Sequence, residues 1–294
     1  MIPRPRTAEG LKLSHWLLFI VTFAATVMTG IGLHPDGSDI SEGLGLIRQS
    51  PSFLLQGFPY ALSLLFLIAS HELGHLAAGW KHGMRVTMPY FIPGPPYLTL
   101  GTFGAFIRIK SPIPSRNALI EMGAMGPVFG FTASLLAAAA GYILLSAGYR
   151  LPTDFGFNIR YPLGFALTRS LFTGTFEMEG MLFENPVIAS AWIGFFIQGL
   201  NLLPVGQLDG GHILYGVFRG GHGKISRAIA AAFLLMTPFG LHFLVWAVLF
   251  FILGFNHPPT ISDELPPGRK QRLLAFASLM IFIMSFHPLP FVTG

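Results

Sequence analysis

Apolar runs long enough to cross a lipid bilayer restrict the fold of this chain more than any other feature. A spanning helix needs about 20 apolar residues, and its backbone groups must find their hydrogen bonds within the segment. Apolar runs recur at 13–33, 58–80, 117–147, 186–203, 225–236, 241–255 and 273–286. They predict an all-α polytopic membrane protein with about six to seven transmembrane helices, some of them short or tilted. We interpret residues 1–294 as one such membrane domain.

Lysine and arginine are distributed unevenly among the segments between these runs. Of 18 cationic residues, only Arg48, Arg150, Arg160 and Arg169 fall on one side of the predicted membrane. Because cytoplasmic loops carry an excess of Lys and Arg, this bias predicts a cytoplasmic N-terminus. We expect a multi-pass protein of a prokaryotic cytoplasmic membrane. A net charge of +5 is spread over short loops rather than gathered on one face, which argues against a nucleic-acid partner and for the lipid bilayer.

Two longer polar stretches separate the runs on the non-cytoplasmic side. Residues 34–57 are mainly acidic, and residues 148–185 mix Arg, Asp and Glu. We expect the second stretch to be an outer loop that is partly ordered at most. The chain contains no cysteine, so neither a disulfide nor a thiolate metal ligand is available to it.

Helical periodicity breaks down after the second run. Residues 86–115 contain six prolines, which are incompatible with a continuous helix, and residues 99–110 are rich in Thr, Phe and Ile. We expect a small membrane-associated β-hairpin here. Since unpaired backbone cannot face lipid, the hairpin must pack against protein or line a wet cavity. Its edge is a candidate for receiving a substrate peptide as an added strand, and a structural lid is the alternative.

Strongly polar side chains lie inside the second apolar run. His71 and His75 are four residues apart, so a helix places them one turn apart on one face, close enough to bind one ion. Glu72 is next in sequence, where it can activate a metal-bound water rather than bind the metal. Zn²⁺ suits imidazole ligands and keeps an open position beside three protein ligands. The alternative is a chance group of hydrogen-bonded side chains, which the cost of ionisable groups in lipid disfavours.

A second motif follows the fourth run, where a proline and a glycine interrupt the helix. Asp209 lies ten residues before Arg219, the same offset that separates His71 from Lys81. Both motifs should therefore reach a similar depth, which makes Asp209 a candidate third zinc ligand, with helix capping as the alternative. Asn201 is a candidate for polarising a substrate carbonyl, and capping is again the alternative.

His212 is also close to the second motif. It lies three residues after Asp209 and is a possible ligand by type. A catalytic zinc needs one open position, which His71, His75 and Asp209 already leave. We therefore expect His212 to support the site or to pack.

The two motifs together resemble those of the site-2 proteases, zinc metalloproteases that cleave within membranes. The resemblance rests on His-Glu-Leu-Gly-His at 71–75, Asn-Leu-Leu-Pro at 201–204, Leu-Asp-Gly at 208–210 and Gly-Pro-Val-Phe-Gly at 126–130. It covers a catalytic core at 55–215 and indicates a form that lacks a PDZ insert, because the stretch 148–185 is too short to hold one.

The resemblance implies a function and a role for each candidate residue. His71, His75 and Asp209 would bind Zn²⁺, Glu72 would be the general base, and Asn201 would assist the substrate carbonyl. The implied reaction is hydrolysis of peptide bonds in or near transmembrane segments of membrane-protein substrates, as in regulated intramembrane proteolysis. The alternative is a non-proteolytic zinc-binding membrane protein, either chaperone-like or a transporter. A transporter typically carries ionisable residues along several spans, and a degenerate protease should lack the glutamate that this chain retains.

Single introduced cysteines test the predicted topology. Arg85→Cys should be protected from an impermeant thiol reagent added outside intact cells, because the charge bias places it in the cytoplasm, whereas Glu177→Cys should react. The chain has no cysteine of its own, so the parent protein serves as the blank. Labelling of Arg85→Cys from outside, with Glu177→Cys protected, would reverse the orientation.

Overall fold

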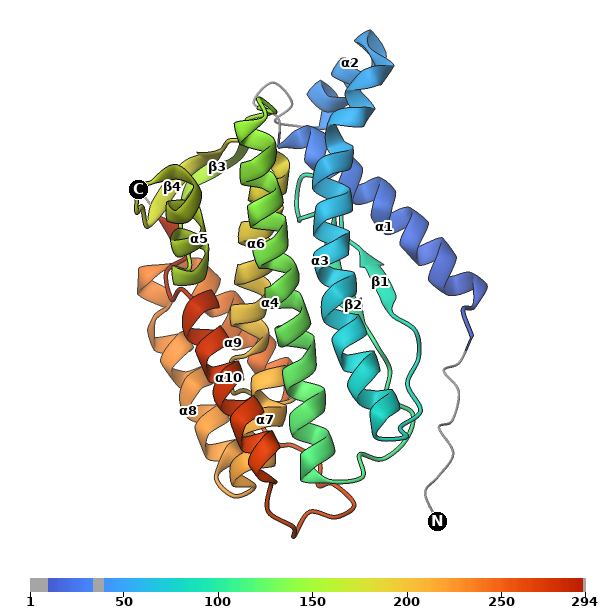
Figure 1. Ribbon diagram of the computed structural model, residues 1–294, viewed down its shortest axis with the longest axis vertical. Helices are drawn as coiled ribbons and strands as arrows, with labels where there is room; N and C mark the ends of the chain where they lie inside the picture. Colours follow the sequence, from blue (N-terminus) through green and yellow to red (C-terminus); the bar gives the residue numbers. More distant parts are fainter. Residues whose placement is uncertain (1–9, 34–39, 293–294) are drawn as a thin grey trace.

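The protein is described by a computed structural model over residues 10–33 and 40–292, and it is mainly helical (Figure 1). The helices are α1 (Leu13–Gly32), α2 (Ile40–Gln49), α3 (Leu54–Lys81), α4 (Arg116–Ser146), α5 (Leu163–Thr173), α6 (Pro186–Asn201), α7 (Asp209–Phe218), α8 (His222–Leu235), α9 (Leu241–Leu253) and α10 (Arg269–Ser285). Short 3-10 turns occur at η1 (Pro51–Phe53) and η2 (Thr237–Phe239). The strands are β1 (Tyr90–Pro93), β2 (Thr102–Phe106), β3 (Thr153–Arg160), β4 (Glu179–Phe183) and β5 (Phe291–Val292). The predicted helical class is right, and small antiparallel sheets add to it.

Three helical segments in the described residues are long and apolar enough to cross a membrane. They are α1, the η1–α3 segment Pro51–Lys81, and α4, while α6 and α9 are apolar but shorter. The predicted runs at 225–236 and 241–255 are the helices α8 and α9, separated by η2, and the last run is α10. The three long helices match three predicted spans, and a total of six to seven crossings stays a prediction.

Helices α3, α4 and α6 form the centre of the bundle and pack against one another (Figure 1). A Cβ atom on Gly74 of α3 would lie 2.2 Å from the Met125 carbonyl oxygen of α4, so the two backbones touch at this point. Around the crossing, Leu64, Leu67 and Phe195 are fully buried. Lipid tails are as apolar as these side chains, so close approach at small residues, more than apolar burial, holds the helices together.

The hairpin predicted after the second span is confirmed. Strands β1 and β2 are antiparallel, with Phe91 opposite Ala105, and they lie beside α1 and α3 (Figure 1). The ring of His15 on α1 stacks on Tyr90 of β1 with 3.9 Å between ring centroids. On the side away from β1, the edge of β2 pairs with no strand of the described residues. The hairpin is therefore held against the bundle while one strand edge stays available.

The expectation that residues 148–185 are partly ordered at most was wrong, while their location outside the membrane stays a prediction. The stretch contains β3, α5 and β4, and β5 joins them in a sheet of order β4-β3-β5. Arg169 of α5 donates to Glu177 and to Glu184 at 2.7 Å each, which pairs the charges that had suggested a solvated loop. Phe165 and Phe183 are fully buried in the main core. The charged residues of this stretch suggested a solvated loop, but the stretch is an ordered part of the fold that packs against the bundle.

The predicted loop 34–57 also contains more helix than expected. Helix α2 covers Ile40–Gln49, and α3 begins at Leu54 rather than at residue 58. The part of this prediction that concerns residues 34–39 lies outside the described residues.

Polar contacts tie the ends of three helices together at the end of the bundle that the topology prediction assigns to the cytoplasm. Glu121 of α4 accepts hydrogen bonds from Lys81 at the end of α3 and from Gln271 in the first turn of α10. His82 lies 2.9 Å from the same carboxylate. The side chain of Glu121 is buried, so these partners satisfy a carboxylate that would otherwise be costly to place there.

Candidate metal centre

Helices α3 and α7 bring together the three side chains predicted as metal ligands. His71 and His75 lie one turn apart on α3, and Asp209 is the first residue of α7. The His71 Nε2 atom is 3.3 Å from Asp209 Oδ2, and the His75 Nε2 atom is 3.4 Å from Asp209 Oδ1. All three side chains are buried. Leu208, not Asp209, occupies the N-cap position of α7, so the capping alternative does not describe Asp209.

The other nitrogen of each histidine ring is already engaged. His75 Nδ1 lies 2.7 Å from the backbone carbonyl oxygen of Met122, and His71 Nδ1 lies 2.8 Å from Gln198 Oε1. Both oxygens only accept, so both Nδ1 atoms donate, and each neutral ring keeps a lone pair on Nε2. Those Nε2 atoms are 2.9 Å apart, and while both rings are neutral neither of them carries a proton. Two lone pairs and a carboxylate converge on one point, and a cation there would remove their repulsion.

The spacing of these atoms suits zinc. Bonds of about 2.0 to 2.1 Å in a tetrahedron place ligand atoms roughly 3.3 Å apart. The three separations here are 2.9, 3.3 and 3.4 Å, and the set consists of two imidazoles and a carboxylate, which are ordinary zinc ligands. The donor set therefore fits a zinc ion that keeps a fourth position open.

Glycines of α4 leave room for these side chains. A Cβ atom on Gly126 would lie 2.2 Å from His75 Nε2, and one on Gly130 would lie 2.4 Å from the Gln198 amide nitrogen. Any larger residue at either position would push a ligand, or the side chain that holds a ligand, out of place. The glycine series on this helix therefore shapes the site in addition to permitting helix packing.

A cavity of about 260 Å³ opens beside the ligands, and both predicted catalytic residues line it. Glu72 is buried and lines this cavity together with Ile107, the residue immediately after β2. Asn201, the last residue of α6, lies on the wall of this cavity and of a neighbouring one of about 380 Å³. The second cavity runs along β2 and is mostly apolar, with Phe103, Phe196 and Trp246 in its lining. The two cavities together place a polar centre next to an apolar channel.

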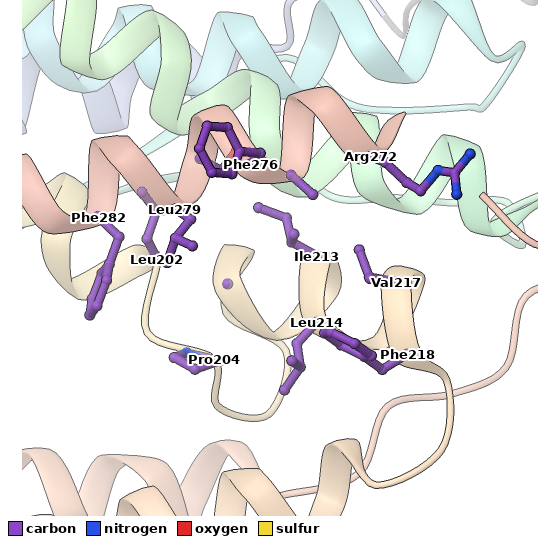
Figure 2. Close-up of a pocket in the computed structure, with 13 residues that line it drawn as sticks. Leu202, Pro204, Ile213, Leu214, Val217, Phe218, Arg272, Phe276, Leu279 and Phe282 are labelled. Atoms are coloured by element: carbon purple, nitrogen blue, oxygen red, sulfur yellow. The ribbon is translucent and has the colours of Figure 1, made fainter. Parts of the chain in front are cut away.

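A larger apolar cavity of about 430 Å³ lies on another face of α7 (Figure 2). Figure 2 shows Ile213 and Val217 of α7 pointing toward α10, which contributes Phe276 and Leu279 to the lining. Among the described residues that line it there is no histidine, aspartate or glutamate. The candidate ligands and Glu72 therefore line the smaller cavity, although it is not the largest space among the described residues.

Sequence reasoning missed the groups that orient the histidines. Gln198 is fully buried on α6 and holds His71, while a backbone carbonyl of α4 holds His75. A glutamine inside an apolar helix, three residues before Asn201, was the available signal for the first. A backbone carbonyl leaves no signal in a sequence. Groups that accept a hydrogen bond from the ring nitrogen that does not bind the metal fix the orientation and the tautomer of metal-binding histidines.

Comparison with known proteins agrees with this geometry. The family model for Peptidase family M50, the family of the site-2 proteases, matches residues 59–245, which is more than half of the chain. The chain belongs to this family. The matched region contains all three candidate ligands together with Glu72 and Asn201. The helices long enough to span a membrane fit an integral membrane protein of this family, and the predicted resemblance is confirmed.

Several curated relatives carry names that agree with the family. A probable zinc metalloprotease EGY2 of the chloroplast from Arabidopsis thaliana is 28% identical over 81% of this chain and 43% of its own length. The EGY2 protein of Oryza sativa subsp. indica is 28% identical over 81% of the chain and 44% of its length. The Arabidopsis probable zinc metalloprotease EGY1, also chloroplastic, is 25% identical over 92% of the chain and 52% of its length.

The chain spans about half the length of these relatives. Their chloroplastic names give no support to the predicted prokaryotic cytoplasmic membrane. No solved structure matches the chain.

The contact between Gln198 and His71 predicts a loss of zinc affinity on mutation. Gln198→Leu removes the acceptor for His71 Nδ1, and loss of such a partner typically weakens metal binding by about 10- to 100-fold. Gln198→Glu is the matched control, because its carboxylate still accepts from the ring. Competition with a chelator of known affinity measures the change. Equal zinc affinity in the parent and Gln198→Leu would show that this hydrogen bond does not support the site.

Proposed function

We propose that this protein is an intramembrane zinc metalloprotease that hydrolyses peptide bonds in or near transmembrane segments of membrane proteins. The observation that carries the proposal is the convergence of three ligand side chains beside Glu72, in a cavity bordered by β2. The helix that carries His71, Glu72 and His75 is long and apolar enough to span a membrane. The names of the relatives, probable zinc metalloproteases, agree with this chemistry.

Within this proposal His71, His75 and Asp209 hold the zinc ion. When bound, zinc supplies Lewis acidity at the open coordination position. The chain itself keeps the ligands in place before the metal arrives, through the hydrogen bonds from His71 to Gln198 and from His75 to the Met122 carbonyl. Pre-organised ligands of this kind reduce the rearrangement that metal binding requires.

Glu72 acts as the general base. Its carboxylate lines the cavity next to the ligands and takes a proton from the water that attacks the peptide carbonyl. The same carboxyl group can then return that proton to the departing amine nitrogen, so the proton balance closes within the site. Ala105, Phe106 and Ile107, at the end of β2 and just after it, line the same cavity as this carboxylate.

Asn201 assists the substrate carbonyl. The end of α6 places its amide on the wall shared by both cavities, where an N–H donor would meet the oxygen of a peptide that crosses from one to the other. Donors aimed at the position where negative charge develops are a major source of catalysis in acyl transfer.

The substrate is an extended segment of a membrane protein that adds to the edge of β2. No strand of the described residues pairs with that edge, and Ala105 and Phe106 of β2 line the catalytic cavity. A helix hides its amide groups in its own hydrogen bonds, so the substrate must unwind before it can pair with a strand. The apolar neighbouring cavity, with its aromatic lining, would take the side chains of such a segment. A catalytic core at 55–215, acting in regulated intramembrane proteolysis, contains the zinc ligands, Glu72, Asn201 and β2, while Trp246 of α9 completes the apolar cavity.

A Glu72→Gln variant tests the reaction. It should bind zinc as the parent does, because Glu72 is not among the ligands. It should cleave about 10²- to 10⁴-fold more slowly, because the amide is not a base. The assay uses the full chain in lipid and a single-pass test protein with Asn and Gly at the centre of its transmembrane helix. Glu264→Gln, at an exposed position of the α9–α10 segment, is the matched control.

Two outcomes would contradict the proposal. Cleavage by zinc-loaded Glu72→Gln at the parent rate would remove Glu72 from the mechanism. A zinc-loaded parent that cleaves no membrane substrate, with or without helix-breaking residues, would favour the alternative of a non-proteolytic zinc-binding membrane protein.

A further inference from the structure

A second pair of histidines meets at the edge of the catalytic cavity. His212 lies in the first turns of α7, and His257 lies in the segment that connects α9 to α10. The Nδ1 atom of His212 is 2.7 Å from the Nε2 atom of His257, although the two residues are 45 positions apart. The ring of His212 lines the same cavity as Glu72 and the metal ligands. The sequence predicted that His212 supports the site or packs, and it named neither His257 nor the cavity as the partner of this ring.

The hydrogen bonds of this pair fix where its protons lie. His257 Nδ1 is 2.6 Å from the backbone carbonyl oxygen of Pro258, which only accepts, so Nδ1 carries a proton. Burial lowers the pKa of His257, so the ring is neutral and its Nε2 has a lone pair. The proton in the bond between the two rings therefore belongs to His212 Nδ1. A neutral His212 then has no proton on Nε2, its remaining nitrogen.

The segment that carries His257 is itself held firmly against α7. The His257 ring stacks on Tyr215 with 4.6 Å between centroids, and the Tyr215 hydroxyl donates to Asp263 at 3.0 Å. Arg219 lies 2.7 Å from the same carboxylate. Burial opposes ionisation of Asp263, yet the hydrogen bonds from Tyr215 and Thr260 hold its pKa below the usual range. The acceptor for His212 therefore cannot swing away without breaking a connected polar group.

His212 is separate from the metal ligands. The group of side chains whose ligand atoms lie within 4.8 Å of one another comprises His71, His75 and Asp209 among the described residues, and His212 is not in it. Its Nδ1 is engaged by His257, which leaves a lone pair on Nε2 as its one free polar function. A peptide that enters the cavity brings backbone N–H groups that must find acceptors once they leave water.

We propose that His212 is a further catalytic residue of the proposed protease. Its Nε2 accepts a hydrogen bond from a backbone N–H of the bound substrate. His257 is a positioning residue, because its contact with Nδ1 of His212 keeps the proton on Nδ1 and leaves Nε2 unprotonated. The inference rests on the proposed function for the identity of the ligand, a peptide segment. The conclusion that the ring of His212 is held in one tautomer rests only on the contacts of His212 and His257. His212 lines the same cavity as Ala105 and Phe106 of β2, so both would contact a peptide bound there.

Nitrogen NMR of the full-length, zinc-loaded protein labelled with ¹⁵N-histidine tests the tautomer directly. Protonated and unprotonated ring nitrogens have well-separated shifts, and loss of a signal in His212→Gln assigns the residue. We expect an unprotonated Nε2 in the parent. His257→Leu should move the proton of His212 to Nε2, because the acceptor for Nδ1 is gone, whereas His257→Gln keeps an oxygen acceptor and should leave the His212 signals as in the parent. A protonated His212 Nε2 in the parent, or unchanged His212 signals in His257→Leu, would overturn the proposal.

Binding of a synthetic peptide hydroxamate to the same zinc-loaded protein tests the contact with the peptide. The probe carries backbone N–H groups next to its zinc-binding end. His212→Phe should weaken binding about 10- to 100-fold, because a buried N–H of the probe loses its acceptor. His212→Gln, which places an acceptor near the position of Nε2, should restore most of the affinity. His287→Phe, after the end of α10, is the control for an aromatic replacement of a histidine.

The outcomes separate this inference from the proposed function. Equal binding by the parent and His212→Phe, at equal zinc content, would overturn the contact with the peptide. The spectra and the binding measurement need no turnover, so they decide the role of His212 whether or not a substrate is cleaved. The Glu72→Gln comparison, in contrast, decides proteolysis and is indifferent to the tautomer of His212.

Discussion

The convergence of two imidazole lone pairs and one carboxylate inside an apolar bundle is the constraint on which the rest of this structure depends. His71 and His75 both donate through Nδ1, so their Nε2 atoms face each other 2.9 Å apart with Asp209 beside them. Such a group is repulsive without a cation, and it is costly to bury among apolar side chains. The fold is consistent with a site whose stability depends on the ion that it binds.

The residues around the site leave room for the ligand side chains and orient them. Gly126 of α4 gives His75 its room, and the carbonyl of Met122, one turn earlier, orients the same ring. Gln198 of α6 orients the other ring and itself fits against Gly130. Three helices of the bundle centre therefore meet at the candidate metal centre. The residues that let these helices pack closely are the same ones that position the ligand side chains.

Much of the metal centre could be predicted from the sequence because helix geometry converts spacing into position. Two histidines four residues apart must share a face, and equal offsets to the basic ends of two segments placed Asp209 at the depth of His71. The hairpin after α3 was predictable because its prolines exclude a helix. A glutamine in an apolar helix marked Gln198 as unusual, but its contact with His71 could not be predicted, and neither could the contact between His212 and His257. The partners are distant in sequence, and no spacing rule links them. The order in 148–185 was missed because its buried Phe165 and Phe183 lie among charges that pair with one another.

X-ray absorption at the zinc edge tests the central claim most directly, because it reports the atoms around the metal in the intact protein. For the zinc-loaded parent the account predicts two imidazole ligands and at least one oxygen, at about 2.0 to 2.2 Å. His75→Ala should lose one imidazole contribution, and Asp209→Ala should lose a carboxylate oxygen or the metal itself. A parent spectrum with three imidazoles, or one that is unchanged in Asp209→Ala, would contradict the assignment of His71, His75 and Asp209 as the ligands.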